Sequence, residues 1–346
     1  MLNAKSKAIL EFIGANSTLS SKDIHNGIKM EIGYATVKRA LTKLTLERLV
    51  LAVGKGKGTK YIIAPAYRLF YPIDVNSYFD KEIDERNIRD SFDLELITKV
   101  LTGVDIFTVK EIEKLNNLQR KYEQNISQLS KGAYSKELER LVIDLSWKSS
   151  QIEGNTYSLL ETEQLLKEKL TAGGKSKDEA VMLLNHKDAL DFIIGDPTYI
   201  TPLMVSRIED IHSILIKELG VERNIRNRRV GISGTNYKPL DNEFQIKEAL
   251  QDMCNLVNGL EGVFEKAFLV LMLISYIQAF ADGNKRTARI LSNAILISSN
   301  YCPISFRTID SVEYKKAMLI FYEQNNITAF KKIFIDQFEF AVNTYF

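Results

Sequence analysis

Apolar residues recur at helical spacing along most of the chain, and one stretch is apolar on every side. Residues 267–277 are almost entirely apolar, which predicts a helix buried in the core. The stretch is shorter than a membrane span, and serine and glutamine interrupt it. Helical spacing resumes in residues 290–295. With only six prolines in 346 residues, the pattern predicts a mainly α fold of two or three domains.

The first 66 residues have a pattern of their own. Apolar positions predict short helices around residues 9–13, across residues 19–28 and across residues 33–49. Residues 50–64 alternate, turn at a tip of glycine and lysine and alternate again, which predicts a β-hairpin. Three short helices followed by a hairpin with a basic tip resemble a winged helix-turn-helix domain.

The winged-helix resemblance implies contact with DNA through residues 36–60. In that family the third helix enters the major groove and the wing touches phosphate. The groove residues would be Thr36, Lys38 and Arg39, and the phosphate residues Lys55, Lys57 and Lys60. Because the formal net charge of the whole chain is only +2, any DNA-binding surface must be local. The alternative is that these charges merely solvate a dimerisation or protein-binding domain.

Further predictions concern the middle of the chain and the cellular location of the protein. Residues 67–105 are mixed and charged with weak periodicity, which predicts a connecting segment with one or two short helices. Cys254 and Cys302 form no CxxC pattern, and the first ten residues lack the apolar core of a signal peptide. We therefore expect a cytoplasmic protein with reduced thiols that makes no membrane contact.

The stretch "QAFADGNKRTAR", residues 278–289, is too polar for an ordinary junction between two buried helices. A helix beginning near Lys285 would expose unpaired N–H groups that attract anions. Arg286 and Arg289, about one turn apart, could flank the same anion, and Asp282 beside a phosphate suits Mg²⁺. The turn predicts a magnesium polyphosphate site. The alternative is an aspartate-capped helix with surface arginines.

The same stretch resembles the Fic family motif, H-x-F-x-(D/E)-G-N-(G/K)-R-x-x-R. Seven positions match: Phe280, Asp282, Gly283, Asn284, Lys285, Arg286 and Arg289. The resemblance extends over residues 106–346. "SSQIEGN", residues 149–155, is similar to the family's inhibitory motif (S/T)-x-x-x-E-(G/N), read as Ser149, Glu153 and Gly154. This implies an inhibitory helix near residues 137–154, placed before the core.

The resemblance implies a reaction and a set of site residues. Fic proteins mostly transfer AMP from ATP to a hydroxyl of a protein Ser, Thr or Tyr, so ATP and Mg²⁺ are the implied cofactors. Asp282 would hold the metal, and the nucleotide would be bound by Gly283, Asn284, Lys285, Arg286, Arg289 and Asn293. Residues 228–240 look like the β-hairpin flap that clamps the target in extended form, with Gly231, Ile232, Gly234 and Thr235 in it.

The departure from the motif is Gln278, which stands where the family has the histidine that acts as general base. An amide can orient a hydroxyl but cannot accept its proton near neutral pH. The three histidines present, His25, His186 and His212, are predicted to be structural rather than substitute bases. Gln278 is either an engineered change in an active enzyme, which the otherwise intact motif favours, or the mark of a natural divergent member.

These residues leave three functions open. The leading prediction is an AMP-transferase inhibited by its own Glu153 and impaired at Gln278. Its partner would be a protein hydroxyl, with a second copy of the chain in a homo-oligomer among the candidates. The second is a catalytically silent nucleotide-binding regulator that binds DNA. The third is transfer of phosphocholine or another nucleotidyl group at the same site.

Overall fold

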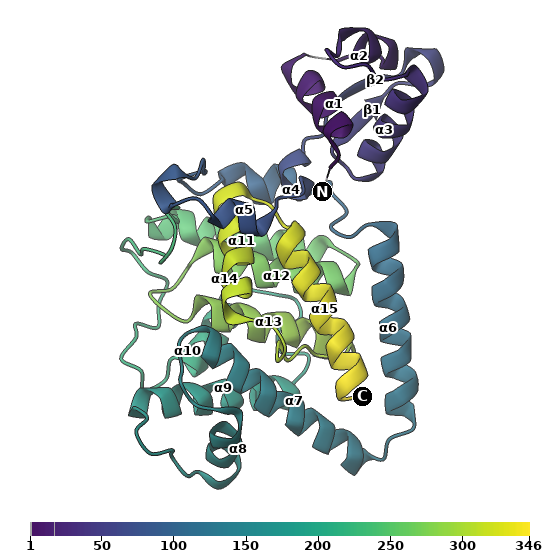
Figure 1. Ribbon diagram of the computed structural model, residues 1–346. Coiled ribbons are helices and arrows are strands. Elements are labelled where there is room, and N and C mark those ends of the chain that lie inside the picture. The colour runs from purple at the N-terminus through teal and green to yellow at the C-terminus, as the bar shows by residue number, and fades with distance from the viewer. Residues whose placement is uncertain (1, 17) are drawn as a thin grey trace.

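The computed structural model describes residues 2–16 and 18–346, and its N-terminal part contains the three helices and the hairpin that the sequence predicts. In Figure 1 this part stands apart at the top of the molecule. Its elements are α1 (Ala4–Ala15), α2 (Ser21–Gly27), α3 (Tyr34–Leu46), β1 (Val50–Val53) and β2 (Lys60–Ile63), with β1 and β2 antiparallel. The side chain of Lys57 falls outside the described residues. The winged-helix likeness and the boundary at residue 66 stay predictions.

Residues 67–105 hold more structure than a connection requires. Two short helices are present, α4 (Tyr67–Phe70) and α5 (Val75–Phe79), followed by a 3₁₀ turn at Ile83–Glu85 and a π-helical turn at Leu96–Val100. Arg86, in this segment, forms a buried ion pair with Glu323 near the C-terminus. The segment is therefore packed onto the helical body that follows it.

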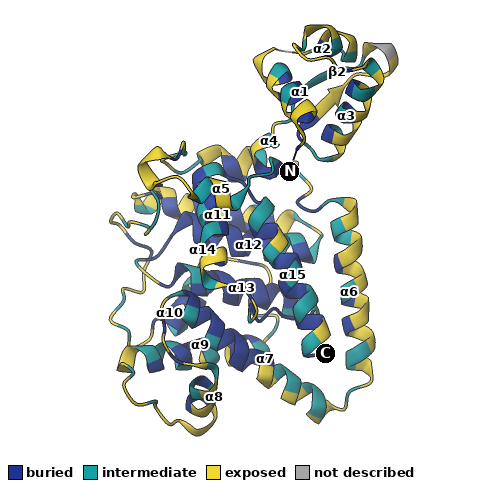
Figure 2. Ribbon diagram, in the orientation of Figure 1, coloured by how far each residue is buried: buried dark blue, intermediate teal, exposed yellow. Residues whose placement is uncertain are grey.

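The rest of the chain is a body of helices built around α12 and α13. These two helices and their neighbours α14 and α15 lie side by side in Figure 1, and Figure 2 shows α12 and α13 buried along most of their length. Every residue from Ala267 to Ile277 is buried, as the sequence predicts. The helices are α6 (Val109–Ser127), α7 (Lys131–Ile152), α8 (Leu159–Glu168), α9 (Lys177–Gly195), α10 (Val205–Leu215), α11 (Glu243–Gly259), α12 (Val263–Ile277), α13 (Asn284–Ser298), α14 (Ser311–Gln324) and α15 (Thr328–Thr344).

Local sequence signals set where several of these helices begin. Capping boxes, in which a hydroxyl and a carboxylate three residues apart satisfy each other's backbone N–H groups, start α6, α8 and α9. The pairs are Thr108 with Glu111, Ser158 with Glu161, and Ser176 with Glu179. Helices α7, α9 and α10 all contact α13, so they form the walls around its N-terminal end.

The prediction of a β-hairpin flap at residues 228–240 is wrong in its secondary structure. These residues, all of which the structure describes, form an irregular loop with a turn at Ser233–Gly234 and no strand. The second half of the loop is bonded to the segment before α6: the Lys238 N–H donates to the Asp90 carbonyl at 2.8 Å. Because that backbone already has a partner, the two halves of the loop form no ladder with each other.

Two further findings concern the cysteines and the character of the helices. Cys254 and Cys302 are both free and buried. Burial raises the pKa of the Cys254 thiol to about 12, so it is protonated at neutral pH. Across residues 2–16 and 18–346, no helix has both the length and the apolar character needed to cross a membrane.

Candidate functional site

The turn between α12 and α13 is shaped by two residues in the left-handed backbone region. Gln278 ends α12 at φ 52° and ψ 53°, and Gly283 precedes α13 at φ 82°. A Cβ atom on Gly283 would lie 3.3 Å from the Ile216 side chain and 3.4 Å from the His212 ring. Both the positive φ and the close approach therefore favour glycine at this position.

The N-terminus of α13 is left without a cap. No side chain accepts a hydrogen bond from its first turn, and among the described residues the backbone N–H groups of residues 284–286 have no partner. Unpaired N–H groups at the start of a helix carry partial positive charge and bind anions. The sequence thus produces a 15-residue helix whose donor end is free.

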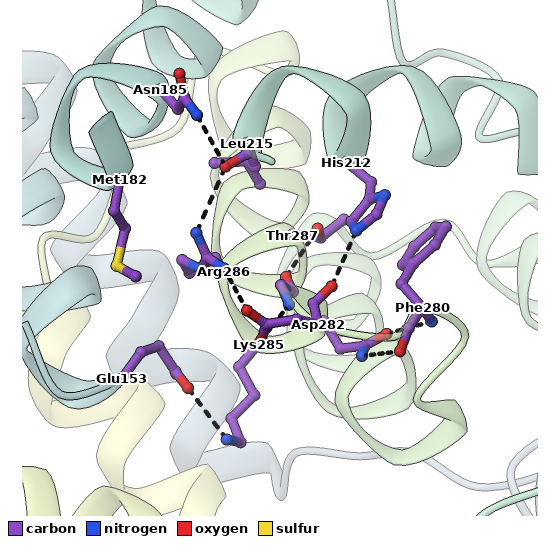
Figure 3. A network of polar contacts seen from close by, with 12 residues as sticks. Glu153, Met182, Asn185, His212, Leu215, Phe280, Asp282, Lys285, Arg286 and Thr287 are labelled. Carbon is purple, nitrogen blue, oxygen red and sulfur yellow. Dashed lines mark hydrogen bonds and ion pairs between the residues drawn. The ribbon is translucent and has the colours of Figure 1, made fainter. Parts of the chain in front are cut away.

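Side chains around the turn hold its backbone in place. Asn284 spans it, since its Oδ1 accepts from the Phe280 N–H at 2.9 Å and its Nδ2 donates to the Phe280 carbonyl at 2.8 Å. His212 stacks on Phe280 with ring centroids 3.6 Å apart, and its Nε2 donates to the Asp282 carbonyl at 2.9 Å (Figure 3). Burial lowers the pKa of His212 to about 4, so the ring is neutral at neutral pH.

Asp282 and Arg286 lie one helical turn apart at this end of α13. The Asp282 carboxylate is 65% exposed, and its Oδ2 accepts from Arg286 Nη2 at 3.2 Å. Arg286 is buried, and its Nη1 lies 3.4 Å from the Leu215 carbonyl (Figure 3). An exposed carboxylate thus stands beside a guanidinium that neighbouring elements hold in a fixed place.

Glu153 lies across from this turn and contacts two of its cations. Glu153 directly follows the last residue of α7, and the next residue, Gly154, has a φ of 103°, at which the chain leaves the helix direction. Glu153 Oε1 lies 2.8 Å from Arg289 Nη2, and its Oε2 lies 3.2 Å from Lys285 Nζ. Burial alone would raise the pKa of Glu153, but the charges of Arg289 and Lys285 outweigh it and lower this pKa to about 2. Glu153 is therefore ionised at neutral pH.

Ser149 completes the contact between α7 and Arg289. Arg289 Nε donates to the Ser149 hydroxyl at 2.8 Å, and its Nη2 donates to the Ser149 carbonyl at 2.9 Å. Ser149 and Glu153 are four residues apart and so share one face of the helix. The structure therefore places both residues of the proposed inhibitory motif on the same arginine, which is itself fully buried.

Two adjoining cavities open beside the turn. The smaller, of about 160 Å³, is bounded by the turn, Gln278, Glu153 and residues 230–233. The larger, of about 550 Å³, lies between α14 and the loop at residues 228–240. Four residues line both cavities: Glu153, Ile232, Ser233 and Lys285. The free end of α13 therefore faces a small polar space that continues into a larger and more apolar one.

Gln278 lines the smaller cavity, but its amide is already engaged. The Nε2 donates to the Ser275 carbonyl at 2.6 Å and lies 3.4 Å from the Tyr322 hydroxyl. The Oε1 accepts from Asn284 Nδ2 at 3.2 Å. The side chain is thus a fixed part of the cavity wall, with spare acceptor capacity on Oε1 only.

Two positions differ from what the sequence led us to expect. Arg289 does not flank the same space as Arg286, because it lines neither cavity and its donors are turned to Ser149 and Glu153. Asn293 also lines neither cavity. Its Nδ2 donates to the Ile304 carbonyl at 3.1 Å and its Oδ1 accepts from the Ile304 N–H at 2.7 Å. Its predicted contact with the nucleoside does not fit this position.

Other site residues were not singled out by the sequence. Arg226 is buried and donates to three backbone carbonyls. Its Nε lies 2.6 Å from the backbone oxygen of Gln278, and its Nη1 lies 2.7 Å from that of Arg228. Its Nη2 donates to the backbone oxygen of Leu240. It thereby joins the motif turn to both ends of the loop at residues 228–240. The flanking "NIRNRR" run shows that arginines are dense here, but nothing in it distinguishes the buried one.

The comparisons with known proteins agree with this geometry. Residues 199–296, which span α10, α11, α12 and most of α13, match the Fic/DOC family model. The protein adenylyltransferase Fic of Nematostella vectensis is 30% identical over 176 residues, which cover 49% of this chain and 40% of that protein. The protein adenylyltransferase fic-1 of Caenorhabditis elegans is 25% identical over 169 residues, 47% of this chain and 33% of that protein.

Solved structures show the same fold over a longer stretch. Residues 134–508 of Fic-1 from C. elegans superpose with a TM-score of 0.60 at 20% identity, covering 68% of this chain and 72% of that one. A Fic domain containing signalling protein from Bacteroides thetaiotaomicron gives a TM-score of 0.57 at 19% identity, covering 67% and 95%. The chain spans less than half the length of the curated relatives that it matches.

Proposed function

We propose that this chain is a Fic-type protein adenylyltransferase, which moves AMP from ATP to a protein hydroxyl and is impaired in its chemical step by Gln278. The observation that carries the proposal is the uncapped N-terminus of α13, which faces a cavity lined by Asp282, Lys285 and Arg286. The names of the relatives support it, since they are protein adenylyltransferases. The adjoining larger cavity has room for the nucleoside.

The proposed reaction assigns a task to each part of the cavity wall. The acceptor oxygen attacks the α-phosphorus, the bond from that phosphorus to the β-phosphate oxygen breaks, and pyrophosphate leaves. The free N–H groups of residues 284–286 and the Arg286 guanidinium stabilise the charge on the phosphates. The acceptor's proton needs a base, and the Gln278 amide cannot take it. Gln278 Oε1 can still accept a hydrogen bond and orient the hydroxyl.

The residues present fit a magnesium ion that arrives with ATP. Within the described residues, no group of three His, Cys, Asp or Glu side chains is placed to hold a metal unaided. Mg²⁺ typically takes one or two carboxylates and completes its shell with phosphate oxygens and water, and the exposed Asp282 carboxylate suits that role. When bound, the ion would neutralise charge on the phosphate oxygens.

Glu153 is proposed to inhibit the site by occupying its cations. Arg289 and Lys285 are each paired with one of its oxygens, so an outer phosphate has to displace Glu153 before it can use either cation. Exposed ion pairs are worth little, but here the Arg289 side chain is 0% exposed and that of Glu153 is 18% exposed. The pair is therefore shielded enough to compete with phosphate.

ATP with Mg²⁺ is expected to bind this chain despite Gln278, because the anion-binding groups do not include that residue. Arg286→Ala should weaken the affinity about tenfold or more, since a charged donor to phosphate is lost. Isothermal titration calorimetry measures this, with circular dichroism to confirm folding and Arg120→Ala, on the exposed side of α6, as the matched control. Equal affinity in Arg286→Ala and Arg120→Ala would place the nucleotide elsewhere.

The charge distribution supports DNA binding as a second candidate function. Of the 46 Lys and Arg and the 44 Asp and Glu, residues 1–66 hold eleven and four, which leaves 35 and 40 for residues 67–346. The N-terminal part is thus net positive and the remainder net negative. Lys38 and Arg39 are exposed on α3, where a groove-binding helix would need them.

Fluorescence anisotropy with a duplex from upstream of the chain's own gene tests this second function. Affinity should fall steeply with salt, and Lys55→Ala should reduce the slope of log K against log salt by about one, as expected when one phosphate contact is lost. Lys332→Ala, exposed on α15, should leave the slope unchanged. An affinity unaffected by Lys38→Ala and Arg39→Ala would argue against DNA contact through α3.

A further inference from the structure

Arg226 holds both ends of the loop at residues 228–240, and between those ends the loop is hydrogen-bonded along its second half. The Gly234 carbonyl accepts a hydrogen bond from Arg86 Nη2 at 3.0 Å. The side-chain amide of Asn236 donates to the Asp84 carboxylate at 2.8 Å. The backbone N–H of Lys238 donates to the Asp90 carbonyl at 2.8 Å. By contrast, among the described residues the backbone groups of residues 230–233 have no hydrogen-bond partner. These four residues border the smaller cavity.

Arg86 is the strongest of these attachments because its own position is fixed. Its side chain is 4% exposed and pairs with Glu323, which is 1% exposed, at 3.0 Å. The Tyr78 hydroxyl donates to the other Glu323 oxygen at 2.6 Å, and the Arg86 guanidinium lies over the Phe79 ring. A buried pair with this many partners gives the Gly234 carbonyl a rigid donor.

We propose that Arg86 is a positioning residue for the protein acceptor. By holding Gly234 to the body formed by α5 and α14, it keeps the unpaired backbone of residues 230–233 extended beside the cavity, ready to pair with an extended acceptor segment. Asp84, Arg86 and Asp90 are thus part of the support of the acceptor site, although the sequence led us to expect a connection here. The role as acceptor site rests on the proposed function, whereas the holding of the loop does not.

The geometry requires arginine in particular. Nη1 binds Glu323 and Nη2 binds the Gly234 carbonyl, so one planar fork serves two partners in fixed directions. A lysine would keep the positive charge beside Glu323 but could not hold both partners at once. Arg86→Lys is therefore the informative variant, because it avoids leaving Glu323 as an unpaired buried charge.

Hydrogen exchange of the chain as it stands tests the holding of the loop. In Arg86→Lys, the amides of residues 235–238 should exchange about tenfold faster, because one charge-assisted hydrogen bond is lost. Arg89→Lys is the matched control: Arg89 lies three residues on, pairs with Asp93 and, among the described residues, has no hydrogen bond or ion pair with the loop. Unchanged exchange in Arg86→Lys, or equal acceleration in Arg89→Lys, would overturn the proposal.

A transfer assay tests the consequence for the acceptor. In a background that combines Gln278→His with Glu153→Gly, Arg86→Lys should lower AMP transfer from labelled ATP to dephosphorylated casein about tenfold, while the Kd for ATP stays within about twofold. A merely destabilising change would affect both readouts. Transfer equal to that of Arg89→Lys would contradict a role toward the acceptor. If the chain with Gln278→His and Glu153→Gly transfers no label, the proposed function fails, and the exchange result alone decides whether Arg86 holds the loop.

Discussion

Gln278→His, combined with Glu153→Gly, is expected to turn this chain into an active AMP-transferase. A general base typically contributes about 10²–10⁴-fold in rate, and Gln278 is the only departure from the motif at its fixed positions. The residue at position 278 lines the cavity beside the free end of α13, so an imidazole there would face an acceptor hydroxyl. Labelling of protein by α-labelled ATP measures the gain.

Single and double variants separate three effects: the base at position 278, the inhibition by Glu153, and the contacts that the Gln278 amide makes in the cavity wall. Gln278→His alone should label weakly, because Glu153 still occupies Arg289 and Lys285. Glu153→Gly alone should stay near background, since no base is present. Gln278→Ala with Glu153→Gly controls for loss of the amide's contacts to Ser275 and Asn284. Background labelling by the histidine double variant, in a chain shown to bind ATP, would refute the proposed function.

How far the sequence predicted the site can be seen at Glu153 and Arg289. The resemblance to two family motifs marked Glu153 as inhibitory and Arg289 as nucleotide-binding. The structure places these two side chains, 136 positions apart in the sequence, 2.8 Å from each other. The buried helix at residues 267–277 and the turn after it were also predicted from local pattern. These features depend on periodicity, on glycine and on a motif of fixed spacing, all of which are visible in one sequence.

The features that were missed depend on which partner a side chain finds in space. Asn293 was assigned to the nucleoside by its spacing from Arg289, yet both faces of its amide are taken by Ile304, eleven residues later. The loop at residues 228–240 was expected to pair with itself, but its backbone bonds to Asp90 in a segment that looked like a connection. A preference for one partner over another is decided by packing, which no local pattern records.

Loss of the Glu153 carboxylate is expected to remove about 3 kcal/mol of folding stability at neutral pH. The pKa of Glu153 falls from its ordinary value of 4.5 to about 2 in the folded chain, and each pKa unit corresponds to about 1.4 kcal/mol. Because the folded pKa is the lower one, this stability is fully present above about pH 4.5. It is lost as the pH falls through about 2, and below that pH the carboxylate is protonated in both states.

Glu153→Gln tests this linkage while keeping the size of the side chain and an acceptor for Arg289. Urea unfolding of both chains without nucleotide should show a difference in unfolding free energy of about 3 kcal/mol at pH 7 that shrinks steadily between about pH 4.5 and pH 2. Glu113→Gln, at an exposed position on α6, is the control and should show little difference at either pH. A difference that is the same at pH 7 and pH 3 would mean that the pair with Arg289 and Lys285 does not hold the charge of Glu153. Inhibition through that pair would then lose its physical basis, because a carboxylate that is not held by the two cations cannot keep phosphate from them.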